Sequence, residues 1–341
     1  MLTPQFTDSF NWFKKLTFLR LRNLFLITTS YYVSLWFKKP VVWGTPVSIS
    51  IEPTTSCNLR CPECPSGLRS FSRATGMLEV DLFKKIVNQS YKTASYLLLY
   101  FQGEPYLHPK FTELVRYAAR KRLYTATSTN AHYLTDENAR QTVASGLDRL
   151  IISIDGTTQE TYQSYRVGGK LAKVMEGTRN IIAWKKKLKS TTPYVVFQFL
   201  VVKPNEHQIE EIKALGKELG VDKVAFKTAQ LYDYKQGNSL MPTIKKYSRY
   251  KKLPDGTYAF KNKLKNQCWK MWHSSVITWN GSVVPCCFDK DAAHQQGSLK
   301  EHSLDKIWGN KKYDAFRKQL LTNRKSIDIC QNCTEGTKVW G

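Results

Sequence analysis

Acidic side chains are scarce in this sequence of 341 residues. Only 27 aspartates and glutamates oppose 52 lysines and arginines, so the formal net charge is +25. The excess is concentrated in residues 235–270 and in the N-terminal segment, where Asp8 stands alone against Lys14, Lys15, Arg20, Arg22, Lys38 and Lys39. Such a charge suits nucleic acid, an anionic membrane surface or an anionic substrate, and equally a charged face that keeps a protein in solution.

A cleavable signal peptide and a long apolar run are also missing. No small-residue cleavage site closes an apolar region near the N-terminus. The uncharged residues 23–37 are too few for a membrane-spanning helix, which needs about 20. We therefore expect a cytoplasmic protein. Aromatic residues and lysines flank this stretch on both sides, so residues 1–46 are expected either to lie on the inner membrane face as a peripheral contact or to pack on the protein as a cap.

Internal repeats and low-complexity tracts are absent, and a regular alternation of elements begins at residue 47. Apolar runs predict strands at 47–51, 96–101, 125–129, 149–154, 195–202 and 223–228. Patterns of helical period lie between them at 78–89, 111–122, 135–145, 173–188 and 207–219. Alternating strands and helices indicate an α/β fold with a parallel sheet. Six units are too few to close an eight-unit barrel, so we expect an open, partial (β/α)6 barrel.

The alternation stops near residue 236, where turn-rich sequence begins and after which the remaining five cysteines follow. The sequence therefore predicts three parts: a basic aromatic N-terminal segment at 1–46, a core domain at 47–235, and a smaller C-terminal domain at 236–341.

Polar and glycine-containing stretches follow the predicted strands. They include Gly103, Glu104 and Pro105 after the second strand, Asn130 after the third, and Ser153 with Asp155 at the end of the fourth. Parallel α/β folds bind their ligands at the carboxyl ends of the strands. We expect an active site at this edge of the sheet.

Three cysteines, Cys57, Cys61 and Cys64, follow the first strand within eight residues. A redox pair would leave one thiol over, and a zinc site would need a distant fourth ligand. Three thiolates can instead hold an iron–sulfur cubane and leave one iron open for a non-protein ligand.

The spacing Cys57-x3-Cys61-x2-Cys64 after a first strand resembles the radical S-adenosylmethionine (SAM) superfamily. The resemblance implies that these cysteines hold a [4Fe-4S] cluster whose open iron binds SAM. It also implies cleavage of SAM to a 5′-deoxyadenosyl radical that abstracts hydrogen from a substrate. The same resemblance implies that the cofactor is contacted by Gly103, Glu104, Pro105, Asn130, Ser153, Asp155 and Arg166. The sequence departs from the family's motif at Gln102, where a glycine is usual.

A second group, Cys268, Cys286, Cys330 and Cys333, makes a four-thiolate set, which suits either a closed cubane or structural zinc. Its spacing resembles the SPASM/twitch extension of the same superfamily, with too few cysteines for two clusters, which implies one auxiliary [4Fe-4S] cluster. Cys287 is expected to be a buried small hydrophobic residue rather than a ligand.

The expected function is therefore a radical SAM oxidoreductase or related enzyme. Its substrate would be a small or lipid-linked molecule, oxidised through the auxiliary cluster, with an electron donor such as flavodoxin or ferredoxin. One alternative is a radical enzyme that modifies ribosomal peptides. Another is a non-enzymatic iron–sulfur or zinc protein that binds nucleic acid, although nucleic acid is not the partner we expect.

Overall fold

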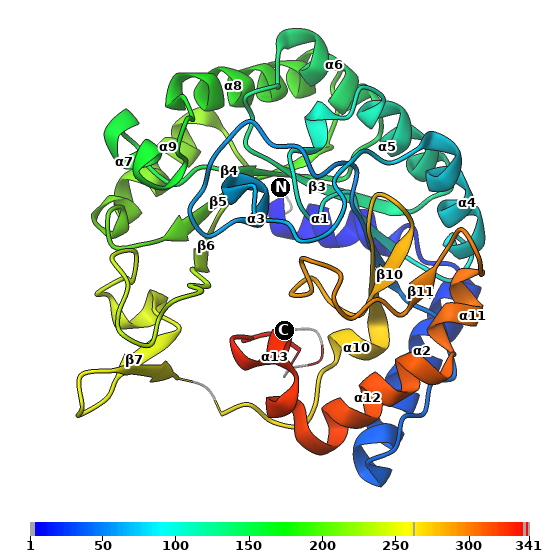
Figure 1. Ribbon diagram of the computed structural model, residues 1–341. Helices are drawn as coiled ribbons and strands as arrows, with labels where there is room; N and C mark the ends of the chain where they lie inside the picture. Colours follow the sequence, from blue (N-terminus) through cyan, green and yellow to red (C-terminus); the bar gives the residue numbers. More distant parts are fainter. Residues whose placement is uncertain (1–3, 262, 337–338, 340–341) are drawn as a thin grey trace.

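Six parallel strands form an open arc in the order of the chain (Figure 1). The structure is a computed structural model that describes residues 4–261, 263–336 and 339. Each strand pairs in parallel with its neighbour along the chain. The strands are β1 (Ser48–Ile51), β2 (Tyr96–Leu98), β3 (Tyr124–Thr129), β4 (Arg149–Ser153), β5 (Tyr194–Val201) and β6 (Lys223–Thr228). The predicted partial (β/α)6 barrel is confirmed.

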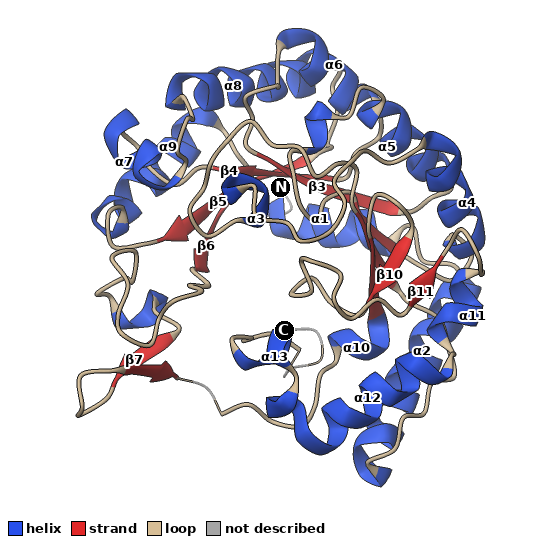
Figure 2. Ribbon diagram, viewed as in Figure 1, coloured by secondary structure: helices blue, strands red, loops and turns tan. Residues whose placement is uncertain are grey.

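Helices cover the outer face of the arc, and the strands lie inside them (Figure 2). Helix α5 shows why: it buries Phe111, Leu114, Val115 and Ala118, which recur at helical spacing, against the sheet. The helices of this region are α3 (Pro65–Leu68), α4 (Val80–Ser90), α5 (Phe111–Arg120), α6 (Asp136–Ala144), α7 (Gln159–Tyr165), α8 (Leu171–Lys187) and α9 (Ile209–Leu219).

The C-terminal part adds strands to the same sheet. Strand β9 pairs in parallel with β1, so that Ser48 lies opposite Ser274, and the full order is β11-β10-β9-β1-β2-β3-β4-β5-β6. Strands β9 to β11 thus extend the arc beyond β1, while β7, α10, α12 and α13 lie on its open side (Figure 1). The elements are β7 (Tyr250–Lys252), β8 (Tyr258–Phe260), α10 (Lys270–His273), β9 (Ser274–Ile277), β10 (Ser282–Val284), β11 (Gly297–Ser298), α11 (Leu304–Trp308), α12 (Lys311–Asn323) and α13 (Asp328–Gln331). The domain limits at residues 46 and 235 stay predictions.

Two N-terminal helices, α1 (Pro4–Phe13) and α2 (Phe18–Phe37), pack under the amino ends of the strands. Lys15, just after α1, forms an ion pair of 2.5 Å with Asp148, which immediately precedes β4. Tyr31 of α2 packs edge-on against Trp272 of α10. In the part of the chain that the structure describes, no helix has the length and hydrophobicity needed to cross a membrane.

Candidate active site

The loop between β1 and α3 carries Cys57, Cys61 and Cys64, which line one cavity of about 190 Å³ at the carboxyl ends of the strands. The loop is compact because Gly67 allows close approach. A Cβ at this position would lie 2.5 Å from the Cys61 backbone nitrogen. The structure thus brings the three predicted ligands to a common cavity.

These thiols fit a cluster better than a single ion. Among the described residues, no three His, Cys, Asp or Glu side chains converge closely enough to hold one metal ion. A cubane takes its thiolates on separate irons, so its ligands stand around a cavity as these do. Burial raises the pKa of Cys57 to about 11 and also raises that of Cys61, where the Arg166 charge opposes the shift. Cluster binding would therefore release protons from buried thiols.

Glu104 lies at the cavity wall and is 2% exposed. Its carboxylate accepts hydrogen bonds from the Thr129 hydroxyl (2.7 Å), the Asn130 amide (2.8 Å) and the Tyr106 amide (3.2 Å). Burial raises the pKa of Glu104 to about 6, although these hydrogen bonds oppose the shift. Glu104 therefore joins the end of β2 to the end of β3 and presents a buried carboxyl to the cavity.

Asp155 positions Arg166. The Asp155 carboxylate accepts from Arg166 Nε at 2.5 Å and from the Leu200 amide at 2.7 Å, and Asp155 is fully buried. Arg166 in turn directs Nη1 towards Cys61 Sγ at 3.8 Å. The pair places a cation beside the cysteine trio, where it suits an anionic group such as a carboxylate.

The other predicted contacts divide into two groups. Gly103, Asn130 and Ser153 line the cavity with Glu104 and Arg166, whereas Pro105 and Asp155 lie outside its lining. Gly103 has a φ of 75°, and a Cβ there would lie 2.2 Å from the Thr54 carbonyl oxygen. The glycine is required because the second-strand loop crosses the cysteine loop at that point.

Sequence reasoning missed Gln198, which also lines this cavity from β5. Its side chain belongs to the inward-facing set of the strand. The available signal was weak: Gln198 is the one polar residue in the run VVFQFLVV.

The second cysteine set gathers around Arg324, which the sequence analysis did not single out. Arg324 is 0% exposed and donates to Cys333 Sγ at 3.5 Å and to the Gln267 and Glu335 carbonyls. Burial lowers the pKa of its guanidinium, but the charges of Cys268, Cys333 and Cys330 more than offset that effect and raise it. A buried cation beside Cys268, Cys330 and Cys333 is suited to an anionic cluster.

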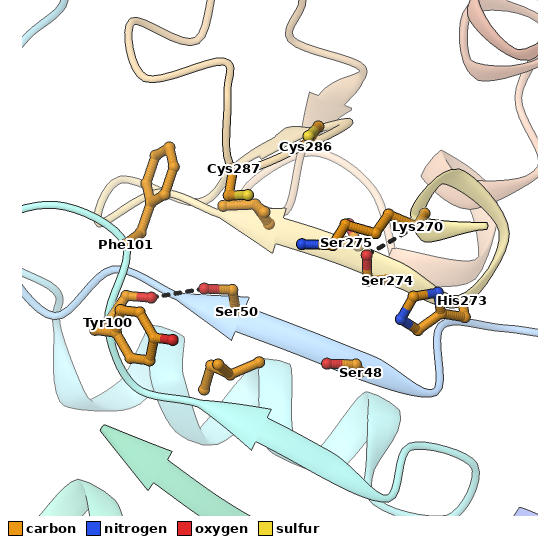
Figure 3. A pocket seen from close by; sticks show the side chains of 12 residues that line it. Ser48, Ser50, Tyr100, Phe101, Lys270, His273, Ser274, Ser275, Cys286 and Cys287 are labelled. Carbon is orange, nitrogen blue, oxygen red and sulfur yellow. Dashed lines mark hydrogen bonds between the residues drawn. The ribbon is translucent and has the colours of Figure 1, made fainter. Parts of the chain in front are cut away.

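A second chamber, of about 210 Å³, lies next to the cavity of the first cysteine trio and is lined by Cys286 of the C-terminal set and by Cys287 (Figure 3). Its walls include Ser48 and Ser50 of β1, and it shares Tyr100 and Phe101 with the cavity of the first trio. The other labelled lining residues are Lys270, His273, Ser274 and Ser275.

The expectation that Cys287 is buried is wrong, because its side chain is exposed to this chamber. The chain leaves β10 at Val284, and the following turn points Cys287 over β1 (Figure 3). Its pKa is lowered to about 6, first by a hydrogen bond with Cys286 and then, against burial, by the Lys270 charge. Asp289, two residues after Cys287, does not face the chamber in the same way. It is 1% exposed, and its carboxylate accepts hydrogen bonds from the Ala293 and His294 amides of its own loop.

Two stretches of the chain match known protein families. The radical SAM superfamily profile matches residues 51–216, and the profile of SPASM, an iron–sulfur cluster-binding domain, matches residues 268–334. The chain is 27% identical over 311 residues to a tungsten-containing aldehyde ferredoxin oxidoreductase cofactor-modifying protein of Pyrococcus furiosus, covering 83% of this chain and 86% of that protein. It is 30% identical over 178 residues to an AdoMet-dependent heme synthase of Methanosarcina barkeri, covering 52% of this chain and 49% of that protein.

Solved structures share the fold. Streptococcus suis SuiB bound to S-adenosylmethionine superposes with a TM-score of 0.63 at 14% identity, over 86% of this chain and 73% of SuiB. BtrN in complex with AdoMet and 2-DOIA superposes with a TM-score of 0.52 at 18% identity, over 85% of this chain and 93% of BtrN. At these identities the likeness is one of fold.

Proposed function

Because the chain belongs to the radical SAM superfamily and carries a SPASM domain, we propose that it oxidises a polar small molecule held in the chamber lined by Cys286 and Cys287. It is an enzyme, which removes the alternative of a non-enzymatic iron–sulfur or zinc protein. The observation that carries the proposal is that the two cavities lie next to each other, because Tyr100 and Phe101 line both of them. A substrate in the chamber would lie beside both sites.

The first cavity supplies the SAM side of the reaction. When bound at Cys57, Cys61 and Cys64, the cluster and SAM supply a 5′-deoxyadenosyl radical that can take a hydrogen atom from a substrate. The chain's own groups would hold the cofactor: Arg166, whose Nη1 lies 3.8 Å from Cys61 Sγ, would pair with an anionic group, and the buried Glu104 would accept from an amino group. An external one-electron donor, such as flavodoxin or ferredoxin, is part of this proposal, as is a cytoplasmic location where thiols stay reduced.

The chamber supports a compact, hydroxylated substrate. Its volume of about 210 Å³ is below the range typical of larger ligands, about 300–1,000 Å³. Ser48 and Tyr100 present hydroxyls to it, and Lys270 adds a cation that is paired with Glu335 at 3.0 Å. These hydroxyls and this cation can bind the oxygens of a small hydroxylated molecule, free or linked to a lipid, while the apolar part of the lining packs against its carbon atoms.

Cys287 is the group we assign to accept the proton that leaves the substrate after hydrogen abstraction. Its thiol faces the chamber beside Lys270, whose charge favours the thiolate. Cys286 would be engaged as a cluster ligand, so its hydrogen bond to Cys287 would be lost while the Lys270 charge remains. Cys268, Cys286, Cys330 and Cys333 would hold the auxiliary cluster, which would supply an acceptor for the electron left on the substrate.

The alternative substrate is a ribosomal peptide. Peptide complexes exist among the structural neighbours, including SuiB bound to its precursor peptide SuiA. Because the sequence identity to these proteins is low, the similarity supports a shared fold only. The small volume of the chamber favours a small-molecule substrate over a peptide.

The proposal is tested by anaerobic reconstitution. We expect about eight irons per chain and formation of 5′-deoxyadenosine with dithionite. The joint replacement of Cys57, Cys61 and Cys64 by alanine should abolish 5′-deoxyadenosine and leave the auxiliary iron. Zinc in the C-terminal set, or cleavage of SAM by the triple variant, would contradict the site assignment.

Alkylation tests the role of Cys287 separately from turnover. If the seven other cysteines are ligands, iodoacetamide should label the native reconstituted protein at Cys287. Labelling at Cys268 or Cys333 instead, with Cys287 protected, would overturn the ligand set. The Cys287→Ser variant should keep its iron and its 5′-deoxyadenosine formation while losing substrate oxidation.

A further inference from the structure

Helix α2 buries a face of mixed polarity and exposes large hydrophobic side chains. Its buried face carries Arg20, Asn23 and Ser34, each at most 4% exposed. The Arg20 guanidinium donates to the Tyr91 carbonyl, and the Asn23 side chain donates to the Thr45 carbonyl and accepts from its amide. These polar side chains attach the helix to the body of the protein together with Ile27 and Tyr31, which are buried in the hydrophobic core.

The outward face of α2 is aromatic. Phe18 is 79% exposed, Phe25 68%, Tyr32 55% and Trp36 84%. Their spacings of seven, seven and four residues place them on one side of the helix, along about 27 Å. A water-exposed helix normally turns this face towards the core. Since these side chains make so little contact with the fold, they are available to a partner.

The aromatic face continues onto α1. Trp12 of α1 and Leu21, Leu24, Phe25 and Thr28 of α2 line an open apolar groove of about 320 Å³. Of the 17 exposed large hydrophobic side chains among the described residues, 11 fall between Phe6 and Trp43. This concentration defines one surface, the α1–α2 surface, rather than scattered exposure.

The charges around this surface are positive. Lys14, Arg22, Lys38 and Lys39 are exposed. Across residues 4–46 the sole acidic side chain is Asp8, which is 4% exposed and bonded to Arg149. Aromatic rings beside lysine and arginine match the interface of an anionic lipid leaflet, where rings lie at the headgroup level and basic groups meet lipid phosphates.

We propose that the α1–α2 surface docks the enzyme on an anionic membrane leaflet. The helices lie under the amino ends of the strands: Asn23 bonds to the Thr93 carbonyl before β2, and Trp272 before β9 bonds to the Val41 carbonyl. The active site opens at the opposite, carboxyl edge. Docking would therefore leave the cavity of Cys57, Cys61 and Cys64 on the side of the protein away from the membrane. The inference does not depend on the proposed reaction.

The test measures co-sedimentation of the full reconstituted protein with vesicles. We expect binding to phosphatidylcholine vesicles that contain phosphatidylglycerol, and much weaker binding to phosphatidylcholine alone. The Phe18→Ser, Phe25→Ser and Trp36→Ser triple variant should bind at least about 50-fold more weakly. Arg22→Gln with Lys39→Gln should cost about 30-fold on the anionic vesicles and change nothing on the neutral ones.

A matched control is Leu188→Ser, which removes an exposed hydrophobic side chain at the end of α8 and should leave binding unchanged. Iron content and melting temperature verify the fold of each variant, and Trp36→Ser alone replaces the triple variant if that one is unstable. Failure of the wild-type protein to bind anionic vesicles, or unchanged binding of the aromatic variant, would overturn the proposal. A dimer that the aromatic variant converts to monomer would instead make the surface an interface between copies.

Discussion

The Arg324 guanidinium lies among the thiols of the second cysteine set, so Arg324→Gln tests what that set holds. The substitution removes a buried positive charge 3.5 Å from Cys333 Sγ and leaves the Gln267 and Glu335 carbonyls short of donors. Glutamine can satisfy one of these carbonyls at most. We expect the variant to fold with a stability lower by about 3 kcal/mol.

The larger consequence concerns the reduction potential of the auxiliary cluster. At an effective dielectric constant of about 20, a unit charge about 5 Å from the added electron contributes on the order of 3 kcal/mol. Losing that attraction makes the cluster harder to reduce. For a one-electron couple, the midpoint potential should fall by on the order of 140 mV.

An EPR-monitored redox titration measures this shift, and alanine at Cys57, Cys61 and Cys64 isolates the auxiliary cluster. Arg317→Gln is a matched control, because Arg317 is also 0% exposed but bonds to the Trp308 carbonyl and Asp314. The Arg317→Gln variant should be less stable, but the midpoint potential of its auxiliary cluster should be unchanged. A shift below about 30 mV in Arg324→Gln, or an equal shift in both variants, would refute the electrostatic reasoning.

Three further predictions concern packing, pH and the N-terminal segment. Gly103→Ala places a Cβ 2.2 Å from the Thr54 carbonyl oxygen, so unfolding experiments should show a loss of about 3 kcal/mol and reconstitution a poorer iron yield. Burial lowers the pKa of His273 to about 4 in the folded protein. The stability that depends on the neutral His273 imidazole is therefore present above pH 6.5 and is lost as pH falls towards 4. In denaturant titrations of cluster-free protein, the free energy of unfolding should be about 2 kcal/mol lower at pH 5 than at pH 7. The His273→Gln variant should not show this difference. Lys15→Ala leaves Asp148 buried without its partner and should cost about 3 kcal/mol in thermal or denaturant unfolding.

Controls separate these effects from general ones. Gly168 has a φ of 81°, and a Cβ there would have no atom within 4 Å, so Gly168→Ala should show the backbone cost alone. Lys213 pairs with Glu210 on an exposed helix face, and Lys213→Ala should cost less than about 0.5 kcal/mol. If Gly168→Ala loses as much stability as Gly103→Ala, the clash at Gly103 is not the cause of the loss. If Lys213→Ala loses as much stability as Lys15→Ala, the burial of the Lys15–Asp148 pair is not the cause. An unchanged pH response in His273→Gln would contradict the assignment to that imidazole.

Local patterns in the sequence predicted most of the core. The strands at 149–154 and 223–228 agree with β4 and β6, because runs of apolar residues between helical patterns depend on neighbours a few positions away. The spacing of Cys57, Cys61 and Cys64 likewise predicted a shared site, since eight residues of one loop cannot separate far. The fold of the C-terminal domain was harder to predict, because no pattern of neighbouring residues indicates that β9 pairs with β1.

The tertiary structure decided which distant polar groups meet. Asp155 was predicted as a cofactor contact, yet its carboxylate is engaged by Arg166 and the Leu200 amide. Cys287 was expected inside the core, but the turn after β10 directs it into the chamber.

The sequence by itself determined the order of strands and helices and the two sets of cysteines, because periodicity and ligand spacing are properties of neighbouring residues. It also carried the aromatic and basic composition of residues 1–46. Only the tertiary structure decided that Arg324 lies among the C-terminal thiols and that α2 turns Trp36 outward and Asn23 inward. Those outcomes depend on which surfaces become buried when segments far apart in the chain pack together, and burial sets both the charge environment and the exposed face.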